Sequence, residues 1–386
     1  MKGLAICHKG VEDITLTEIK ELIDEEGIVQ DSTVVFAADI EKLIKLTYLG
    51  RSIRRTLLLL GRAKISQSFK ELKPLLAQLA QQIDTAQWLD GKTFKVVCER
   101  IGEHEFGSQQ VSEVFGELLL NKHKAATNNS AKTSTKVVMN DPQTVVYIFI
   151  NHKDLYIGID FCGADLSKRE YKIFANSSSL NGAVAYSLIR IAKLKHNETM
   201  VDPFGGSGVI PIEAALFLTN KSVNFFRKDK LLFTKSLKVD LNLLDKTFSP
   251  YFKIITYDNQ INYMKAIKKN AQIAGVNKSI NVSKVDLQWL DTKLDKQSVD
   301  KIITHLPVPS KTVPTDKIDK IYNEFFHQAD YILKLSGTIT FIVEKNAGYK
   351  DSINKCTILN KYKLIEEREV MQGQQPMKIY VMNKQN

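Results

Sequence analysis

The chain has 386 residues, of which 44% are hydrophobic and 25% charged, as is typical of globular proteins with two or three domains. A net charge of +11 makes a polyanion such as nucleic acid the first partner to consider, with a Lys-rich solvated surface as the alternative. No run of about 18 apolar residues is present, which argues against a membrane-spanning helix, and the four scattered cysteines show no disulfide or zinc-binding spacing.

The first 163 residues predict short strands alternating with short helices, the pattern of small α/β domains. Strands are expected at 3–7, 33–37, 54–63 and 94–102, with two more inside 145–163, and helices at 11–25, 39–49, 69–83 and 109–120. The stretch KHKAATNNSAKTSTK at 122–136 is polar and basic and predicts a loop.

After Gly163 a polar stretch, ADLSKREYKIFANSSSL, predicts a linker, and the helix LNGAVAYSLIRIAKL follows. From Thr199 the pattern becomes strand–helix–strand: TMVD, KIITYD, INVSKVD, VDKIIT and GTITFIVEK are apolar strands, and two C-terminal strands are expected at 362–370 and 377–382. This order predicts a doubly wound parallel sheet closed by an antiparallel hairpin. Residues 219–250 do not fit the alternation and are interpreted as an insertion.

The stretch VDPFGGSGVIPIEA at 201–214 places a glycine-rich turn between a strand and a helix. Gly205, Gly206 and Gly208 would allow the backbone to approach a ligand beyond the strand ends. A dinucleotide site would need the spacing GxGxxG, and a P-loop would need a following Gly-Lys-Ser/Thr; neither is present.

Acidic residues end three successive predicted strands, at Asp202, Asp258 and Asp286. S-adenosylmethionine matches this series, because its ammonium group, ribose hydroxyls and adenine amine could each meet one carboxylate. A single Asp at a strand end is more often a helix cap or turn former, which is the alternative for each of the three. Three acids behind one glycine-rich turn favour the cofactor.

Two stretches carry a resemblance to a known family. DPFGGSGVIPIEAAL resembles the first motif of the RNA guanine-N2 methyltransferases, and DNQINYMKAIKKNAQIAGV from Asp258 is similar to their second motif. In the first half, FKVVCERIGEHEFGSQQVSEVFGELL and KVVMNDPQTVVYIFINHKDLYIGIDFCGADLSKREY resemble a THUMP RNA-binding domain behind a ferredoxin-like domain.

The resemblance implies an α/β fold with a Rossmann-like, seven-stranded methyltransferase domain preceded by ferredoxin-like and THUMP domains. The expected domains are ferredoxin-like at 1–68, THUMP at 69–163, a linker and lead-in helix at 164–195, and methyltransferase at 196–386, with the insertion near 219–250. The implied contacts to S-adenosylmethionine are Asp202, Phe204, Gly205, Gly206, Ser207, Gly208, Asp258, Asn259 and Asp286.

The family's catalytic motif follows the fourth strand and reads Asn or Asp, Pro or Leu, Pro, then an aromatic residue. Here VDKIITHLPVPSK places His305, Leu306, Pro307 and Val308 in those positions. A neutral imidazole can accept a hydrogen from the guanine amine, and His305, Leu306 and Pro307 are therefore the expected catalytic residues. The alternative is an ordinary loop histidine in an RNA-binding protein that does not methylate.

The expected function is methylation of the N2 amine of a guanosine in structured RNA, with tRNA as the first substrate to consider and ribosomal RNA as the alternative. RNA contacts are expected at Lys122, Lys124, Lys168, Arg169 and Lys311. A local ion pair with Glu170 or Asp165 is the alternative for Lys168 and Arg169. A cytoplasmic protein without a metal ion is expected, and protein partners are not indicated.

Overall fold

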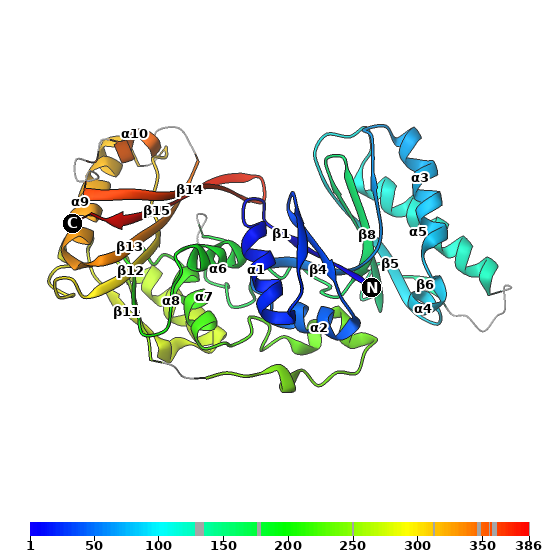
Figure 1. Cartoon of the computed structure of the whole chain (residues 1–386), viewed down its shortest axis with the longest axis horizontal. Helices are drawn as coiled ribbons and strands as arrows, with labels where there is room; N and C mark the ends of the chain where they lie inside the picture. Colours follow the sequence, from blue (N-terminus) through cyan, green and yellow to red (C-terminus); the bar gives the residue numbers. More distant parts are fainter. Residues whose placement is uncertain are drawn as a thin grey trace. The chain divides into compact units, whose positions relative to one another are not determined.

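The computed structural model describes residues 1–127, 135–175, 179–248, 251–311, 313–345, 349–354, 356 and 361–385 (Figure 1). The chain divides into two compact units. The N-terminal unit comprises residues 1–7, 15–166 and 227–244, and the C-terminal unit comprises residues 8–14, 167–226 and 245–386. The domain boundaries expected at residues 68, 163 and 195 stay predictions.

The N-terminal unit is built on one eight-stranded sheet with the strand order β2-β3-β1-β4-β8-β7-β5-β6. Its elements are β1 (Lys2–Cys7), α1 (Glu12–Ile23), β2 (Gly27–Gln30), β3 (Thr33–Ala37), α2 (Ile40–Leu49), β4 (Ile53–Lys64), α3 (Phe69–Gln82), α4 (Thr85–Leu89), β5 (Thr93–Ile101), α5 (Ser108–Ala126), β6 (Lys136–Val137), β7 (Thr144–Asn151) and β8 (Asp154–Asp160). The regions expected as ferredoxin-like and THUMP domains share this sheet, because β4 pairs with β8 along its length.

Four features of this unit differ from the sequence prediction. Strands β2 and β6 and the short helix α4 were not predicted, and α5 continues to Ala126, so the loop expected at 122–136 was wrong for its first five residues and for Lys136. Helix α5 continues because His123 is buried and the ammonium of Lys122 donates to the carbonyls of Gln81 (2.7 Å) and Ile83 (2.5 Å). The part of that loop at 128–134 lies outside the described residues.

The residues expected as an insertion fold partly with the N-terminal unit. Residues 227–244 contain three 3₁₀ turns, at Lys228–Lys230, Leu232–Lys235 and Leu241–Leu244. The amide of Leu232 donates to the carbonyl of Cys162, and the ring of Phe233 lies 6.1 Å from that of Phe161. This segment therefore extends the hydrophobic core of the first unit.

The C-terminal unit contains a seven-stranded sheet with the order β11-β10-β9-β12-β13-β15-β14, in which only β15 is antiparallel to its two neighbours. Its elements are α6 (Gly182–Ile191), β9 (Thr199–Asp202), α7 (Val209–Leu218), β10 (Lys253–Asp258), α8 (Ile261–Ala274), β11 (Ile280–Lys284), β12 (Val299–His305), α9 (Thr315–Ile332), β13 (Leu333–Glu344), α10 (Tyr349–Asn354), β14 (Tyr362–Gln372) and β15 (Gln375–Lys384), with 3₁₀ turns at Asn277–Ser279 and Leu287–Trp289. The predicted Rossmann-like sheet and its closing hairpin are confirmed.

Helices cover both faces of this sheet (Figure 1). The core on one face joins α6, α7 and α8 to the sheet, and the core on the other face contains the buried residues of α9. Because both faces are covered, the carboxyl ends of the parallel strands are the place left for a ligand. None of the helices in the described part of the chain is long and apolar enough to cross a bilayer.

Residues 8–14, although they follow the first strand of the N-terminal unit, pack in the C-terminal unit. Arg368 of β14 donates to both carboxylate oxygens of Asp13, at 2.7 and 3.0 Å, and the amide of Met371 donates to the carbonyl of Lys9. Gly10 has φ +92°, and a Cβ there would lie 2.0 Å from the carbonyl oxygen of Glu369. Only glycine fits this close approach.

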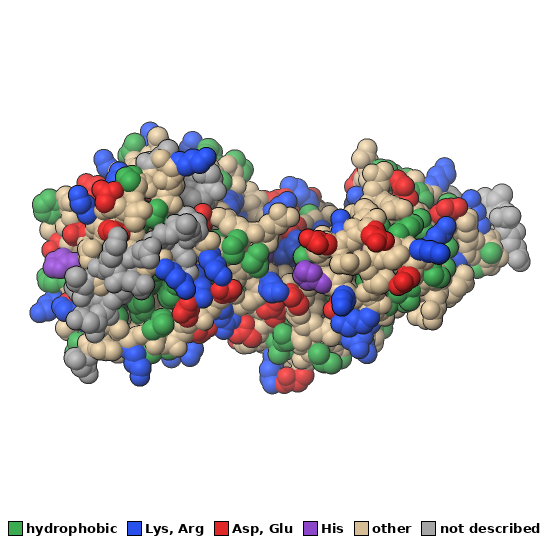
Figure 2. Space-filling model, turned by 90° about the horizontal axis from the view of Figure 1, so that it is seen from above, with side chains coloured by type: hydrophobic (Ala, Val, Ile, Leu, Met, Phe, Trp, Pro, Cys, Tyr) green, Lys and Arg blue, Asp and Glu red, His purple; other side chains and the backbone are tan. Residues whose placement is uncertain are grey.

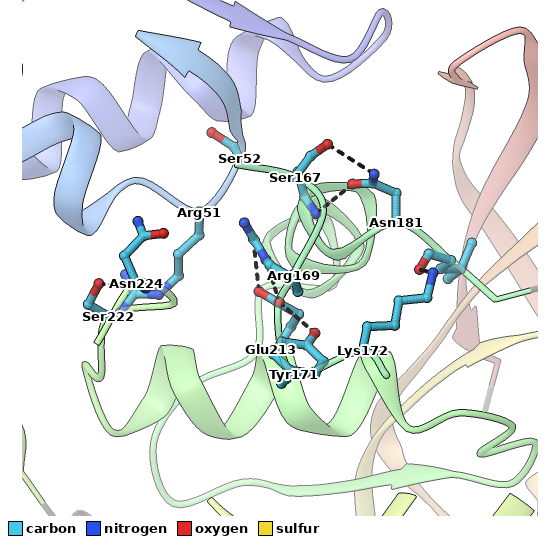
Figure 3. A network of polar contacts seen from close by, with 12 residues as sticks. Arg51, Ser52, Ser167, Arg169, Tyr171, Lys172, Asn181, Glu213, Ser222 and Asn224 are labelled. Atoms are coloured by element: carbon cyan, nitrogen blue, oxygen red, sulfur yellow. Dashed lines mark hydrogen bonds and ion pairs between the residues drawn. The ribbon is translucent and has the colours of Figure 1, made fainter. Parts of the chain in front are cut away.

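The segment leading into α6 is held by a buried ion pair (Figure 3). Arg169 donates through Nε and Nη2 to the two carboxylate oxygens of Glu213 on α7, at 2.8 and 3.2 Å, and the hydroxyl of Tyr171 donates to the same carboxylate at 2.7 Å. Lys172 donates to the carbonyls of Ser179 and Leu180. These bonds fix the chain just before α6 against the helix that follows the glycine-rich turn.

Candidate functional site

A pocket of about 700 Å³ opens at the carboxyl ends of β9, β10, β12 and β13 in the C-terminal unit. The residues lining it are Ser179, Leu180, Asp202, Phe204, Gly205, Gly206, Ser207, Val209, Ile210, Asp258, Asn259, Gln260, Tyr263, His305, Leu306, Pro307, Val308, Ser310, Val313, Glu344 and Gln375. The structure thus brings the predicted glycine-rich turn, the end of β10 and the His-Leu-Pro segment together around one cavity.

The glycine-rich turn is packed tightly against the neighbouring strand. The amide of Gly205 donates to the carbonyl of Tyr257 at 2.8 Å, and a Cβ on Gly205 would lie 2.5 Å from Oγ1 of Thr256. Gly206 and Gly208 have positive φ values of +54° and +81°, and Gly208 precedes the first residue of α7. Glycine is needed at these positions for backbone geometry, and the turn consequently presents main-chain atoms to the pocket.

Asp202 ends β9 and is almost fully buried. Its Oδ1 accepts hydrogen bonds from the hydroxyl of Thr304 at 2.6 Å and from the amide of Phe204 at 3.2 Å. Burial raises the pKa of Asp202 to about 7, and the nearby carboxylate of Asp258 contributes to the rise. The side chain therefore fixes the turn and also presents a carboxyl group to the cavity.

Asp258 ends β10 in a similar arrangement. Its Oδ2 accepts from the amide of Gly206 at 3.0 Å and its Oδ1 from the amide of Gln260 at 2.8 Å, while burial raises its pKa. Asp202 and Asp258 therefore also have the turn-forming role that was the alternative for them, because each accepts hydrogen bonds from nearby backbone amides. Each carboxylate oxygen has further acceptor capacity for a ligand.

The charge of the cavity indicates the kind of ligand that it accepts. The described residues that line it include three carboxyl groups, on Asp202, Asp258 and Glu344, and no Lys or Arg. Two of these carboxyl groups have raised pKa values because burial is not compensated by a cation. A positively charged ligand would stabilise the ionised carboxylates in this cavity, whereas a negatively charged nucleotide phosphate would not.

His305 is the last residue of β12 and is half-buried at the pocket wall. Burial lowers its pKa to about 4, so the imidazole is neutral near pH 7. The amide of Leu306 donates to the carbonyl of Ile342, and the carbonyl of Pro307 accepts from the hydroxyl of Tyr322 at 2.7 Å. The segment after β12 is therefore held from β13 and α9.

Comparison with protein families gives two matches. Residues 169–375 match the methyltransferase domain described as RMKL-like, and residues 74–160 match the THUMP domain. The chain belongs to the RMKL-like methyltransferase family. The predicted family and fold class are confirmed, with a THUMP domain preceding the methyltransferase domain.

Two curated relatives and one solved structure are similar to this chain. A tRNA (guanine(6)-N2)-methyltransferase of Methanocaldococcus jannaschii is 29% identical over 94% of this chain and 95% of its own length. A protein of the same name from Archaeoglobus fulgidus is 24% identical over 91% of this chain and 85% of its own length. The crystal structure of SMU.472 in complex with SAH covers all of this chain and 98% of its own at TM-score 0.81 and 19% identity, and it shows the shared fold.

Two predicted cofactor contacts of this RMKL-like methyltransferase are not among the residues that line the pocket. Gly208 is the residue before α7 and is not among the lining residues. Asp286 is exposed and precedes the 3₁₀ turn Leu287–Trp289, where Trp289 is also 52% exposed. The predicted contact of Asp286 with adenine therefore stays a prediction.

The predicted RNA contacts fall into two groups. Lys124, Lys168 and Lys311 are exposed. Lys122 caps α3 with its ammonium group, and the guanidinium of Arg169 is only 1% exposed in its pair with Glu213, so neither is presented to a phosphate. On the face drawn in Figure 2, Lys and Arg side chains are interspersed with Asp and Glu, and the described residues contain no group of three or more His, Cys, Asp or Glu placed to hold a metal ion.

Several lining residues were missed by sequence reasoning. Gln260 and Tyr263 follow Asp258 at the start of α8, where the helix N-terminus faces a ligand, and that position was a usable signal. Glu344 and Gln375 come from the end of β13 and the start of β15. Only the strand pairing brings these two to the cavity, so no local pattern identifies them.

Proposed function

We propose that this protein transfers a methyl group from S-adenosylmethionine to the exocyclic N2 amine of a guanosine in tRNA. The observation that carries the proposal is a single cavity that runs from the acids Asp202 and Asp258 to the His305–Pro307 segment. The name of the two archaeal relatives, which specifies guanine 6 of tRNA, supports both the reaction and that nucleotide as the target.

The pocket fits S-adenosylmethionine by charge and shape. The cofactor carries an ammonium and a sulfonium group, which match a cavity that has buried carboxyl groups and, among the described residues that line it, no Lys or Arg. When bound, it supplies an electrophilic methyl group on sulfur. Asp202 and the backbone of the glycine-rich turn hold its amino acid end, and Asp258 and Asn259 hold its ribose, since Asp258 ends the adjacent strand β10.

The amine of guanine is a poor nucleophile because its lone pair is delocalised into the ring, so acceptors for its two hydrogens are required. The neutral imidazole of His305 accepts one hydrogen, because its pKa of about 4 keeps a ring nitrogen unprotonated. The carbonyl of Leu306 accepts the other, since the carbonyl of Pro307 is already bonded to Tyr322. The two acceptors direct the lone pair toward the methyl group, and the remaining contribution is alignment.

The substrate assignment depends on the N-terminal unit and on the relatives. The THUMP domain at 74–160 binds the RNA, with exposed lysines such as Lys124 meeting its phosphates, and Lys168 and Lys311 do so from the C-terminal unit. tRNA is preferred over ribosomal RNA because the two relatives that align with more than 90% of this chain carry the tRNA name. A protein acting on tRNA in this way is expected to be cytoplasmic.

The second candidate is an RNA-binding protein that performs no transfer, and the atypical His305 in the catalytic motif favours it. A transfer assay, with binding of the cofactor measured beside it by calorimetry, separates the candidates. Purified protein is incubated with tritiated S-adenosylmethionine and either total tRNA or ribosomal RNA, and the methylated nucleosides are identified by mass spectrometry. The proposal requires N2-methylguanosine in tRNA and a loss of transfer in His305→Ala. Binding of the cofactor without any transfer would refute it.

A further inference from the structure

The cavity extends beyond the His305 segment to a carboxylate that the proposed reaction does not use. Glu344 is the last residue of β13 and is half-buried at the pocket wall. Within the described part of the chain, its side chain forms no hydrogen bond or ion pair. A carboxylate at the pocket wall without a partner among these residues has its full acceptor capacity open to a ligand.

Strand pairing fixes where Glu344 lies relative to His305. His305 of β12 is in register with Ile342 of β13. Because alternate residues of a strand point to the same face, Glu344 lies on the face that carries His305, one step nearer the carboxyl end. Gln375 continues this line, since Glu344 pairs with Met377 of β15 and Gln375 is two residues away.

The order of strands divides the cavity into two parts. Asp258 and Asp202, which hold the cofactor in the proposed reaction, end the strands β10 and β9. Glu344 ends β13, on the other side of β12 and of His305. Neighbouring strands are about 4.8 Å apart, so Glu344 lies roughly 10 Å from the strand that carries Asp202. This second part of the cavity is the one left for the nucleobase.

We propose that Glu344 is the residue that selects guanine, by accepting a hydrogen bond from N1–H of the base. This inference rests on the proposed function. Guanine carries donors at both N1 and N2, whereas adenine has an acceptor at N1, which a carboxylate repels. A bond from N1–H to Glu344 also turns the adjacent N2 amine toward His305 and Leu306.

Charge supports a base as the partner of Glu344. RNA brings negative phosphates, and a carboxylate in an RNA-binding cavity weakens binding unless it faces donors on a base. The described residues around the cavity contain no Lys or Arg that would pair with Glu344 when RNA is absent. The carboxylate is therefore available for the base edge and discourages a phosphate from entering.

The test compares Glu344→Gln with the wild type on two tRNA transcripts, one with guanosine and one with 2-aminopurine riboside at the target position. 2-Aminopurine keeps the amine but has an acceptor at N1. We expect Glu344→Gln to lower kcat/KM on guanosine by about ten- to a hundredfold, the usual effect of losing one charge-assisted hydrogen bond. On 2-aminopurine the variant should be equal to or better than the wild type, because the amide can donate to N1.

The matched control is Glu367→Gln on β14, an exposed carboxylate outside the cavity that pairs with Lys378. This variant should leave kcat/KM unchanged on both transcripts. Affinity for S-adenosylmethionine, measured by calorimetry, should stay within twofold in Glu344→Gln, which also shows that the unit is folded.

Four results would overturn the inference about Glu344 in different ways. An equal loss on both transcripts would mean that Glu344 does not read N1. A fall in cofactor affinity with an unchanged KM for tRNA would assign Glu344 to the cofactor. Unchanged kinetics of Glu344→Gln, beside a wild type that methylates tRNA, would refute this inference alone. A wild type without transfer to any RNA would refute the proposed function as well.

Discussion

Replacing Glu213 by Ala should strongly destabilise the C-terminal unit. Glu213 is fully buried on α7, and its carboxylate accepts from Arg169 at 2.8 and 3.2 Å and from Tyr171 at 2.7 Å (Figure 3). The side chain of Arg169 is 1% exposed, and a Cβ on Gly182 would lie 2.4 Å from its Cγ, so the arginine has little room to turn toward water. The variant would therefore remove the carboxylate that pairs with this buried guanidinium.

The magnitude follows from the loss of one member of this buried ion pair. Removing one partner of a buried ion pair costs about 3–5 kcal/mol, which is roughly a 10²- to 10³-fold change or more in the folding equilibrium constant. Tyr171 loses its acceptor in the same variant, which raises the cost within that range. Replacing both charged residues, as Arg169→Met with Glu213→Leu, should cost much less, because no charge remains buried.

Denaturant unfolding followed by hydrogen exchange and mass spectrometry is the suitable measurement, because peptides from α6 and α7 report on the C-terminal unit separately from the rest. The free energy of unfolding of Glu213→Ala is expected to be lower than that of the double variant by at least about 2 kcal/mol. If the single variant were as stable as the wild type, or if the double variant were the weaker of the two, the buried-charge argument would be refuted.

Substitutions at three other positions test the site and its supports. Asp202 has a pKa raised to about 7, so the free protein should lose stability as pH rises from about 4 through 7. Cofactor affinity measured by calorimetry should rise over pH 6–8, and Asp202→Asn should abolish this rise in affinity. His305 has a pKa lowered to about 4 from 6.5, so its contribution to stability should be lost as pH falls from 6.5 to 4, and kcat should not depend on its titration above about pH 5. In the same tritium assay, His305→Ala should lower kcat about 10- to 100-fold, while His305→Asn should retain more activity. Gly10→Ala should cost about 1–3 kcal/mol in thermal unfolding, because its Cβ would clash with the carbonyl of Glu369 at φ +92°; a stability within 0.5 kcal/mol of the wild type would contradict this estimate.

The sequence predicted the sheet and half of the cavity well, because the relevant signals are local. Apolar strands that end in an acid placed Asp202 and Asp258 correctly at the pocket, and the glycine spacing identified the turn. The same pattern indicated Asp286, which is exposed and is not among the lining residues, so its contact with adenine stays a prediction. An acid after a strand can cap a helix or form a turn as well as bind a ligand, and the strand pattern alone does not distinguish these roles.

The features that sequence reasoning missed depend on residues far apart in the chain. Arg169 was expected to meet RNA or a neighbouring acid, but its partner is Glu213, 44 residues away. Glu344 and Gln375 reach the cavity through the pairing of β13 with β15. Helix α5 is longer than its pattern because Lys122 bonds to carbonyls at the end of α3. Each of these is decided by tertiary contacts that no window of sequence contains.

The position of residues 8–14 has a consequence for the order in which the chain folds. Two partners that complete their packing, Arg368 and Met371, are synthesised about 360 residues after them. At the usual 5–20 residues per second the segment waits roughly 20–70 seconds with Val11 unburied. The C-terminal unit cannot complete its packing before β14 has been synthesised, so a nascent chain stalled before β14 should be the form most in need of a chaperone.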